Sequence, residues 1–159
     1  MIWSDLSKLL HVAVAIFFIA GLIGRTILLH RAARSQDVAA AEAFSEVAET
    51  FDRLVILGMG LALPSGLITA WSQGYPWLGL TTGWVLASVV LIVGINLLVP
   101  TVFLPRGRWF GAAMEHARAE GTITPELRAA FADPVVAAAH IYEALAVAAI
   151  VALMVLKPF

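Results

Sequence analysis

Four long apolar stretches divide this chain of 159 residues and limit the folds open to it. They cover about residues 9–29, 54–71, 84–104 and 135–156. A helix needs roughly 20 apolar residues to cross lipid, because hydrocarbon offers no partner to an open backbone group. The sequence therefore predicts an all-α fold, in which residues 1–159 form a single domain, an antiparallel four-helix transmembrane bundle.

The overall composition excludes several classes of protein. Hydrophobic residues make up 61% of the chain and charged residues 13%, whereas a soluble domain is about 25% charged. Ten Lys and Arg against eleven Asp and Glu leave a net charge of -1, so there is no basic surplus for binding nucleic acid. The absence of Cys excludes disulfides, thiolate metal sites and a Cys nucleophile.

The distribution of basic residues predicts an orientation in the membrane. An even number of spans puts both termini and the middle loop on one side, where the basic residues are Lys8 and Lys157. The other side holds Arg31, Arg34, Arg53, Arg106, Arg108, Arg118 and Arg128. Because basic loops stay in the cytoplasm, we expect an inner-membrane protein of a bacterium with both termini outside and both long loops cytoplasmic.

The two long connections also carry helical patterns. Apolar residues recur at helical spacing from Gln36 to Arg53, which predicts a helix running directly into the second span. The other connection predicts a helix from Arg106 to Glu120, a break at Gly121 and a short helix opened by Thr124-Pro125-Glu126. We interpret both as amphipathic helices lying on the membrane surface. The alternative is a docking face for a soluble partner.

Signals at helix ends and rows of small residues add local detail. Asp133 before Pro134 predicts the start of the last span, and Pro64 and Pro100 predict kinks in the second and third spans. Small residues stand four apart in three spans, at Ala20 and Gly24, at Ala62 and Gly66, and at Ala144, Ala148 and Ala152. Such rows allow close packing of helices, either within one chain or between the chains of a homo-oligomer.

Five polar residues lie inside the predicted spans, where each is costly and therefore a candidate for function. They are His11, Arg25, Asn96, His140 and Glu143. All but His11 share the half of the bundle nearer the long loops. One interpretation is a structural Arg25–Glu143 ion pair, buffered by Asn96 and His140, that holds three helices in register. The other is a proton-accessible pocket or a cradle for a cofactor.

His11 stands apart from this group, near the other face of the membrane. As a lone interfacial histidine it could bond a lipid headgroup or a carbonyl, but a neutral imidazole facing into a helix bundle is also a common axial ligand of haem iron. His11 and His140 differ in depth by roughly 20 Å on the helix rise, so they cannot both bind one iron. His30 and His116 are expected to be solvated.

Several short segments resemble a known group of membrane proteins. They are Leu10-His11-Val12, Ala20-Gly21-Leu22, Arg25 to His30, and the closing Val155-Leu156-Lys157-Pro158-Phe159. Together they resemble the first helix and the C-terminal Lys-Pro close of the HemJ/CopD-like superfamily of small four-helix membrane proteins. The segment Gly83-Trp84-Val85-Leu86-Ala87-Ser88, Pro100 and the chain length resemble more closely a subfamily of predicted integral membrane proteins with no assigned function.

The resemblance implies a haem-linked role. HemJ proteins are protoporphyrinogen oxidases associated with haem b, and the essential histidine of their first helix would correspond to His11. Their pattern also has a lysine early in the third helix, where this chain has no basic residue from Trp84 to Leu91. The copper handling associated with CopD-like proteins would call for soft ligands, and this chain has no Cys.

We therefore expect a small membrane protein that binds haem b and serves redox chemistry or porphyrin handling. His11 would be the metal ligand, and Arg25, Asn96, His140 and Glu143 would bind propionate groups or relay protons. The alternative is a non-catalytic accessory subunit of a larger membrane complex, packed through its small-residue faces. Whether the protein is an enzyme stays open at this point.

Overall fold

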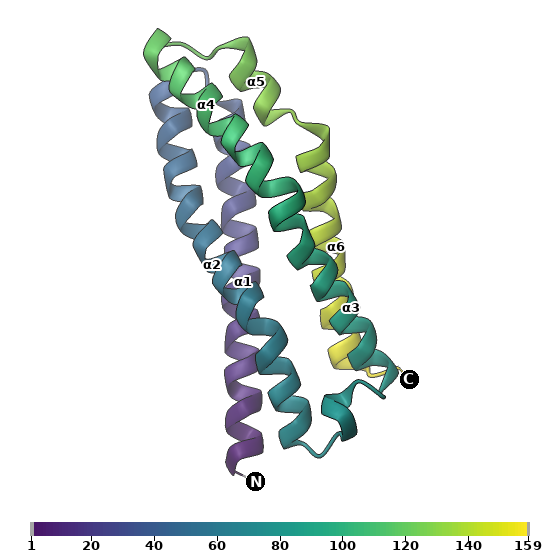
Figure 1. Ribbon diagram of the computed structural model, residues 1–159. Helices are drawn as coiled ribbons and strands as arrows, with labels where there is room; N and C mark the ends of the chain where they lie inside the picture. The colour runs from purple at the N-terminus through teal and green to yellow at the C-terminus, as the bar shows by residue number, and fades with distance from the viewer. Residues whose placement is uncertain (1, 159) are drawn as a thin grey trace.

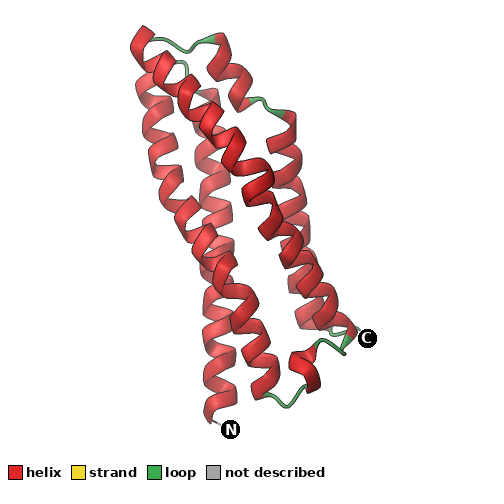
Figure 2. Cartoon of the chain, in the orientation of Figure 1, coloured by secondary structure: helices red, strands yellow, loops and turns green. Residues whose placement is uncertain are grey.

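The apolar stretches form long helices that lie side by side. The computed structural model describes residues 2–158, and every regular element in that range is helical (Figure 2). The α-helices are α1 (Ile2–Arg34), α2 (Val38–Ser72), α3 (Gly83–Leu98), α4 (Leu104–Glu120), α5 (Pro125–Phe131) and α6 (Pro134–Leu156). A 3-10 turn, η1 (Pro76–Gly79), precedes α3, and a π-helical turn, η2 (Val99–Phe103), joins α3 to α4.

The chain runs up and down the long axis of the molecule, with both termini at one end (Figure 1). Within residues 2–158, four helical segments are long and apolar enough to cross a membrane: Ile2–Arg34, Val38–Ser72, Gly83–Glu120 and Pro125–Leu156. The predicted all-α, antiparallel four-helix bundle is confirmed. Large apolar side chains such as Ile23, Leu61 and Leu145 stay more than half exposed, which is the surface expected of a protein that contacts lipid.

Local signals in the sequence account for the helix ends at the loop end of the molecule. Asp133 caps α6 by accepting hydrogen bonds from the backbone N–H groups of Val135 (2.8 Å) and Val136 (3.4 Å). Thr124 caps α5 in the same way through the N–H of Leu127 (3.2 Å). Gly121 ends α4 with a φ of 68°, a left-handed conformation that glycine adopts without a steric penalty.

The connecting helices continue the spans instead of lying on the membrane surface. α2 runs unbroken from Val38 through Pro64 to Ser72, and α4 continues the path of α3 through η2, which contains Pro100 (Figure 1). A helix of 33 residues such as α1 is about 50 Å long, whereas the hydrocarbon core is about 30 Å thick. The interpretation that the connecting helices lie flat on the membrane surface is therefore wrong. The N-terminal part of α2 and the whole of α4 pack along neighbouring helices and extend the bundle beyond the hydrocarbon core.

Close packing is concentrated in two helix pairs. α1 packs along α2, α3 packs along α6, and far fewer contacts join the two pairs. At the first seam, a Cβ on Gly58 would lie 2.7 Å from the Cβ of Phe18, and Gly24 faces the ring of Phe51. The small residues predicted to allow close approach do so within this chain at Gly24. The two pairs leave a groove between them.

Two apolar clusters fill the interior. The first holds the bundle together near its middle through Phe18, Val55, Met59, Ile92, Ile95 and Ala146. The second joins α4 to α5 at the loop end through Ala113, Met114, Ala117, Leu127 and Ala130. Between and around these clusters the groove contains four of the five polar side chains that the sequence singled out, those of His11, Arg25, His140 and Glu143.

Candidate functional site

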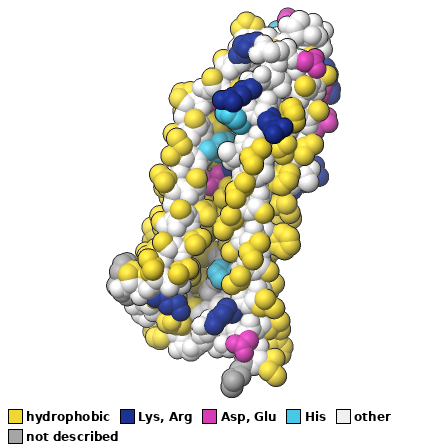
Figure 3. Space-filling model, turned by 180° about the vertical axis from the view of Figure 1, so that it is seen from behind, with side chains coloured by type: hydrophobic (Ala, Val, Ile, Leu, Met, Phe, Trp, Pro, Cys, Tyr) yellow, Lys and Arg dark blue, Asp and Glu magenta, His cyan; other side chains and the backbone are white. Residues whose placement is uncertain are grey.

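The groove holds two cavities of similar size. The termini-side cavity, about 540 Å³, is lined by residues that include Lys8, His11, Trp84 and Lys157. The loop-side cavity, about 520 Å³, is lined by residues that include Arg25, Asp52, His140 and Glu143. Both volumes lie in the range of roughly 300–1,000 Å³ that is usual for small-molecule sites. Seen from behind, histidine and acidic side chains are visible between apolar ridges (Figure 3).

His11 enters the termini-side cavity from α1 and is held by one hydrogen bond. Its Nδ1 lies 2.9 Å from Oγ of Ser65 on α2. The Ser65 hydroxyl also lies 3.2 Å from the carbonyl oxygen of Ala62, so the His11 tautomer protonated at Nδ1 allows both contacts at once. In that tautomer Nε2 of the imidazole keeps its lone pair, the form in which histidine binds a metal.

Further polar contacts join α1 to α2 around His11. The hydroxyls of Ser7 and Ser72 lie 2.7 Å apart, and the Thr69 hydroxyl shares its one proton between the carbonyl oxygens of Ser7 (3.0 Å) and Ser65 (2.8 Å). A Cβ on Gly66 would lie 3.1 Å from Cε1 of His11, so the ring passes close over the backbone there. The seam explains why the ring has a defined orientation in an otherwise apolar cavity.

The charged groups of the termini-side cavity are both positive. Lys8 and Lys157 line it, and none of the described lining residues is acidic. The ammonium group of Lys157 lies 5.4 Å from the ring centre of Trp84, which is within cation–π range. This cavity therefore combines apolar walls with a positive potential.

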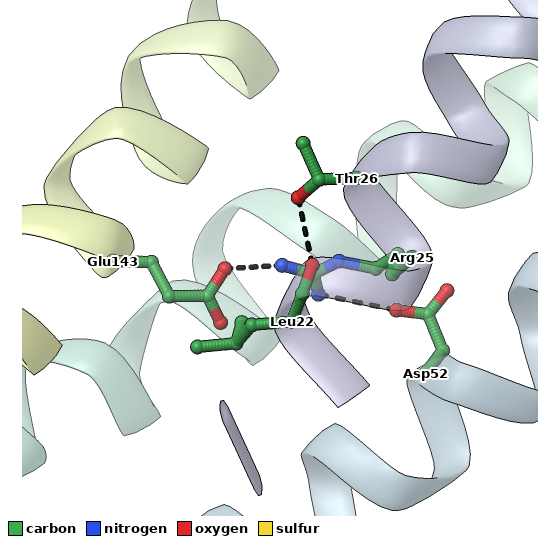
Figure 4. A network of polar contacts seen from close by, with 5 residues as sticks. All are labelled: Leu22, Arg25, Thr26, Asp52 and Glu143. Carbon is green, nitrogen blue, oxygen red and sulfur yellow. Dashed lines mark hydrogen bonds and ion pairs between the residues drawn. The ribbon is translucent and has the colours of Figure 1, made fainter. Parts of the chain in front are cut away.

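The loop-side cavity contains a three-residue ion cluster that joins α1, α2 and α6. Arg25 donates through Nη2 to Glu143 and through Nη1 to Asp52 at 3.1 Å, and Figure 4 shows the guanidinium between the two carboxylates. Arg25 and Glu143 are 5% and 2% exposed, whereas the Asp52 side chain is 43% exposed. The predicted Arg25–Glu143 ion pair is confirmed, and Arg25 is buried in the bundle.

Aromatic and basic groups surround this cluster. The Arg25 guanidinium lies 5.6 Å from the centre of the Phe103 ring, and the ring of His140 stacks on the same Phe103 with centres 5.1 Å apart. Phe103 is the last residue of η2, a π-helical turn of the kind often found at functional sites. Nearby, Arg106 binds the α6 cap Asp133 at 2.6 Å.

The structure separates the predicted site residues into three groups. Arg25, His140 and Glu143 share the loop-side cavity, whereas His11 lies in the termini-side cavity. Asn96 lines neither cavity, and its Nδ2 donates to the carbonyl oxygen of Ile92, one turn back on α3 (2.8 Å). The proposed buffering of the ion pair by Asn96 therefore has no contact to support it, because its amide is used within its own helix.

Sequence reasoning missed Asp52, Phe103 and Ser65. Asp52 lies two residues before the predicted start of the second span, within the predicted cytoplasmic connection. It stands three residues before Val55, which faces α1, and this spacing is the signal that places it near the helix seam. Ser65 and Thr69, four apart on α2, carried a similar signal for a polar seam opposite His11.

Comparison with known proteins identifies the family. The family model described as "Predicted integral membrane protein (DUF2269)" matches residues 5–158. The chain belongs to this family. Searches of curated proteins and of solved structures gave no match. The closer of the two resemblances, to a subfamily of predicted integral membrane proteins, is thus confirmed, while the wider HemJ/CopD-like relationship stays a prediction.

Proposed function

We propose that this DUF2269 protein binds haem b in the termini-side cavity and serves membrane redox chemistry or porphyrin handling. The observation that carries the proposal is the 2.9 Å contact of His11 Nδ1 with the Ser65 hydroxyl, which fits the tautomer whose Nε2 keeps its lone pair. Metal-binding histidines are usually held in this way by a second hydrogen bond, which fixes the tautomer and the ring orientation.

The rest of the cavity fits the same group. Its walls are mainly apolar, with Phe18, Ile92 and Val147 among them, as a porphyrin ring requires. Haem b also carries two propionate carboxylates, and Lys8 and Lys157 supply the positive charge to receive them. When bound, haem would supply one-electron chemistry. The chain would contribute the iron ligand, the apolar enclosure and the two carboxylate partners.

The assignment of the propionate groups to Lys8 and Lys157 differs from the sequence-based prediction, which gave Arg25 this role. Two nitrogens of Arg25 already bind Glu143 and Asp52, and these carboxylates would repel a propionate. We therefore assign the propionate groups to the lysines and leave Arg25 to the ion cluster. The proposal also keeps the predicted orientation, with the termini and the haem cavity on the outer side of the bacterial inner membrane and the arginine-rich loops inside.

Visible spectroscopy of protein in mild detergent tests this proposal. Protein titrated with haemin, oxidised and then reduced with dithionite, is expected to give Soret and α bands that saturate with haemin. His11→Ala should abolish them. His116→Ala is the matched control, because His116 on α4 is exposed and contacts Glu120 at 3.2 Å, and it should leave the spectrum unchanged.

A folded protein that stays colourless, or an unchanged spectrum in His11→Ala, would overturn haem binding at this site. The accessory-subunit alternative predicts such a colourless protein, accompanied by stoichiometric partners in native mass measurement after gentle extraction. The same preparation therefore separates the two functions.

A further inference from the structure

The loop-side cavity contains a buried hydrogen-bond donor with no acceptor. Arg25 is 5% exposed, and two of its nitrogens bind Asp52 and Glu143. Its third, Nε, has no acceptor anywhere in residues 2–158. An unsatisfied buried donor costs roughly 1–3 kcal/mol. Nε is closed even to a water molecule, so a molecule with an acceptor oxygen would be favoured beside it once a small side-chain movement opens Nε to the cavity.

The charges of the cavity exclude an anion as that molecule. Four carboxylates line it, from Glu49, Asp52, Asp133 and Glu143, against two guanidinium groups, from Arg25 and Arg106. A fatty acid or another carboxylate would meet this excess of negative charge in a medium of low dielectric constant. The acceptor oxygen must therefore belong to a neutral group, such as a carbonyl.

The walls of the cavity favour a flat ring. Four aromatic side chains line it, from Phe103, Trp109, Phe110 and Phe131, and aromatic rings prefer to stack on, or meet edge-on, another π-system. The cavity is also lined by residues of both loosely joined helix pairs. A molecule dissolved in the bilayer could enter such a groove from the side.

We propose that the loop-side cavity binds the head group of a membrane quinone. After a small movement of the Arg25 side chain, one carbonyl oxygen accepts from its Nε–H, and the ring packs among Phe103 and Trp109. In the reduced form of the ligand, a hydroxyl donates to the half-exposed carboxylate of Asp52. This inference stands on the loop-side cavity alone and does not depend on haem binding at His11.

Tryptophan fluorescence provides a direct test, because quinones quench nearby indoles. Haem-free protein in dodecyl maltoside is titrated with decylubiquinone, and the wild-type chain is expected to show a saturable component of quenching. Trp109 lines the cavity, so this component should be lost in Trp109→Phe, while the linear quenching due to quinone in the micelle remains.

A cavity-filling variant keeps the test independent of folding. Gly107 lines the cavity, and a Cβ there would meet nothing within 4 Å, so Gly107→Leu adds a side chain without a backbone clash. Gly111→Leu is the matched control, because Gly111 lies one turn along α4, is equally open and does not line the cavity. Gly107→Leu should weaken quinone binding about tenfold or more, and Gly111→Leu should not.

A second variant tests the donor itself. Arg25→Lys keeps the positive charge between Asp52 and Glu143 but removes the guanidinium Nε–H, so we expect quinone binding about tenfold weaker, which corresponds to the loss of one charged hydrogen bond.

Quenching that is linear in quinone concentration for the wild-type protein, as it would be if water or a phospholipid filled the cavity, would overturn the proposal. Equal binding by Gly107→Leu and Gly111→Leu would overturn it as well.

Discussion

The two cavities have similar volumes but opposite charge. The termini-side cavity offers one imidazole and two lysines, whereas the loop-side cavity holds four carboxylates and two arginines. The His11 ring is oriented by one neutral hydroxyl group, that of Ser65, but Arg25 is oriented by ionic contacts. In a low-dielectric groove this difference underlies the two proposals, a metal complex with carboxylates for the first cavity and a neutral carbonyl compound for the second.

The largest expected effect comes from breaking the ion cluster. Arg25→Met leaves Glu143 buried without its partner, and loss of one member of a buried pair costs about 3–5 kcal/mol. We expect that loss in the free energy of unfolding, measured by denaturant titration in detergent. Arg31→Met, on the same helix but outside the cluster, should change it by less than about 0.5 kcal/mol.

A double variant shows whether the cost arises from the stranded charge. Arg25→Met combined with Glu143→Met should recover a large part of the lost stability, because an apolar pair of similar volume is tolerated in place of a buried ion pair. A double variant as unstable as the sum of the two single variants would contradict this explanation.

The corresponding test at the other cavity concerns Ser65. Ser65→Ala removes the hydroxyl partner of His11 Nδ1, and loss of such an outer partner typically lowers metal affinity about 10–100-fold. Haemin titration should show this loss with little change in the unfolding midpoint. Ser45→Ala is the control, because the Ser45 hydroxyl donates to its own helix at Ala41 (2.8 Å) and lies at the loop-side cavity.

The shared α1–α2 seam predicts an effect of intermediate size. In Gly58→Ala the new methyl group would lie 2.7 Å from Cβ and 3.0 Å from Cα of Phe18, so the helices must separate at a cost of about 1–3 kcal/mol. Gly60→Ala, on the same helix, meets nothing within 4 Å and should be neutral or slightly stabilising. Equal unfolding midpoints for the two variants would contradict the close packing of α1 against α2.

The smallest effect is expected at the exposed edge of the ion cluster. Asp52→Asn removes one of the two charges that hold Arg25, but the Asp52 side chain is 43% exposed, so water screens the interaction. We expect a loss of about 1 kcal/mol in the free energy of unfolding, clearly less than for Glu143→Gln. A larger loss of stability in Asp52→Asn than in Glu143→Gln would mean that the main partner of Arg25 lies on α2 and not on α6.

Sequence patterns predicted the fold well because lipid makes the apolar spans obligatory. The cap at Asp133, the break at Gly121 and the continuous helix through Arg53 into the second span are all confirmed. The direction of the connecting helices relative to the membrane plane was predicted wrongly. Their sequence pattern shows one apolar face, but it does not show whether that face packs on lipid or on another helix.

The candidate site was only partly predictable. A charge in a span needs a partner, so Arg25 and Glu143 could be paired by depth alone. The second partner, Asp52, lies outside the predicted span, and its part in the cluster depends on how α2 packs along α1. The isolation of Asn96 and the role of Ser65 depend on rotation of each helix about its axis, which a sequence pattern fixes only within a broad arc.

The central claim, two cavities with separate ligands, is tested most directly by measuring both ligands on the same two variants. Haemin and decylubiquinone are titrated separately into wild-type, His11→Ala and Arg25→Lys protein in the same detergent. We predict that His11→Ala loses haemin and keeps the quinone, whereas Arg25→Lys keeps haemin and binds the quinone about tenfold more weakly. If either variant lost both ligands while staying folded, or if neither variant changed the binding of either ligand, the separation into two sites would be contradicted.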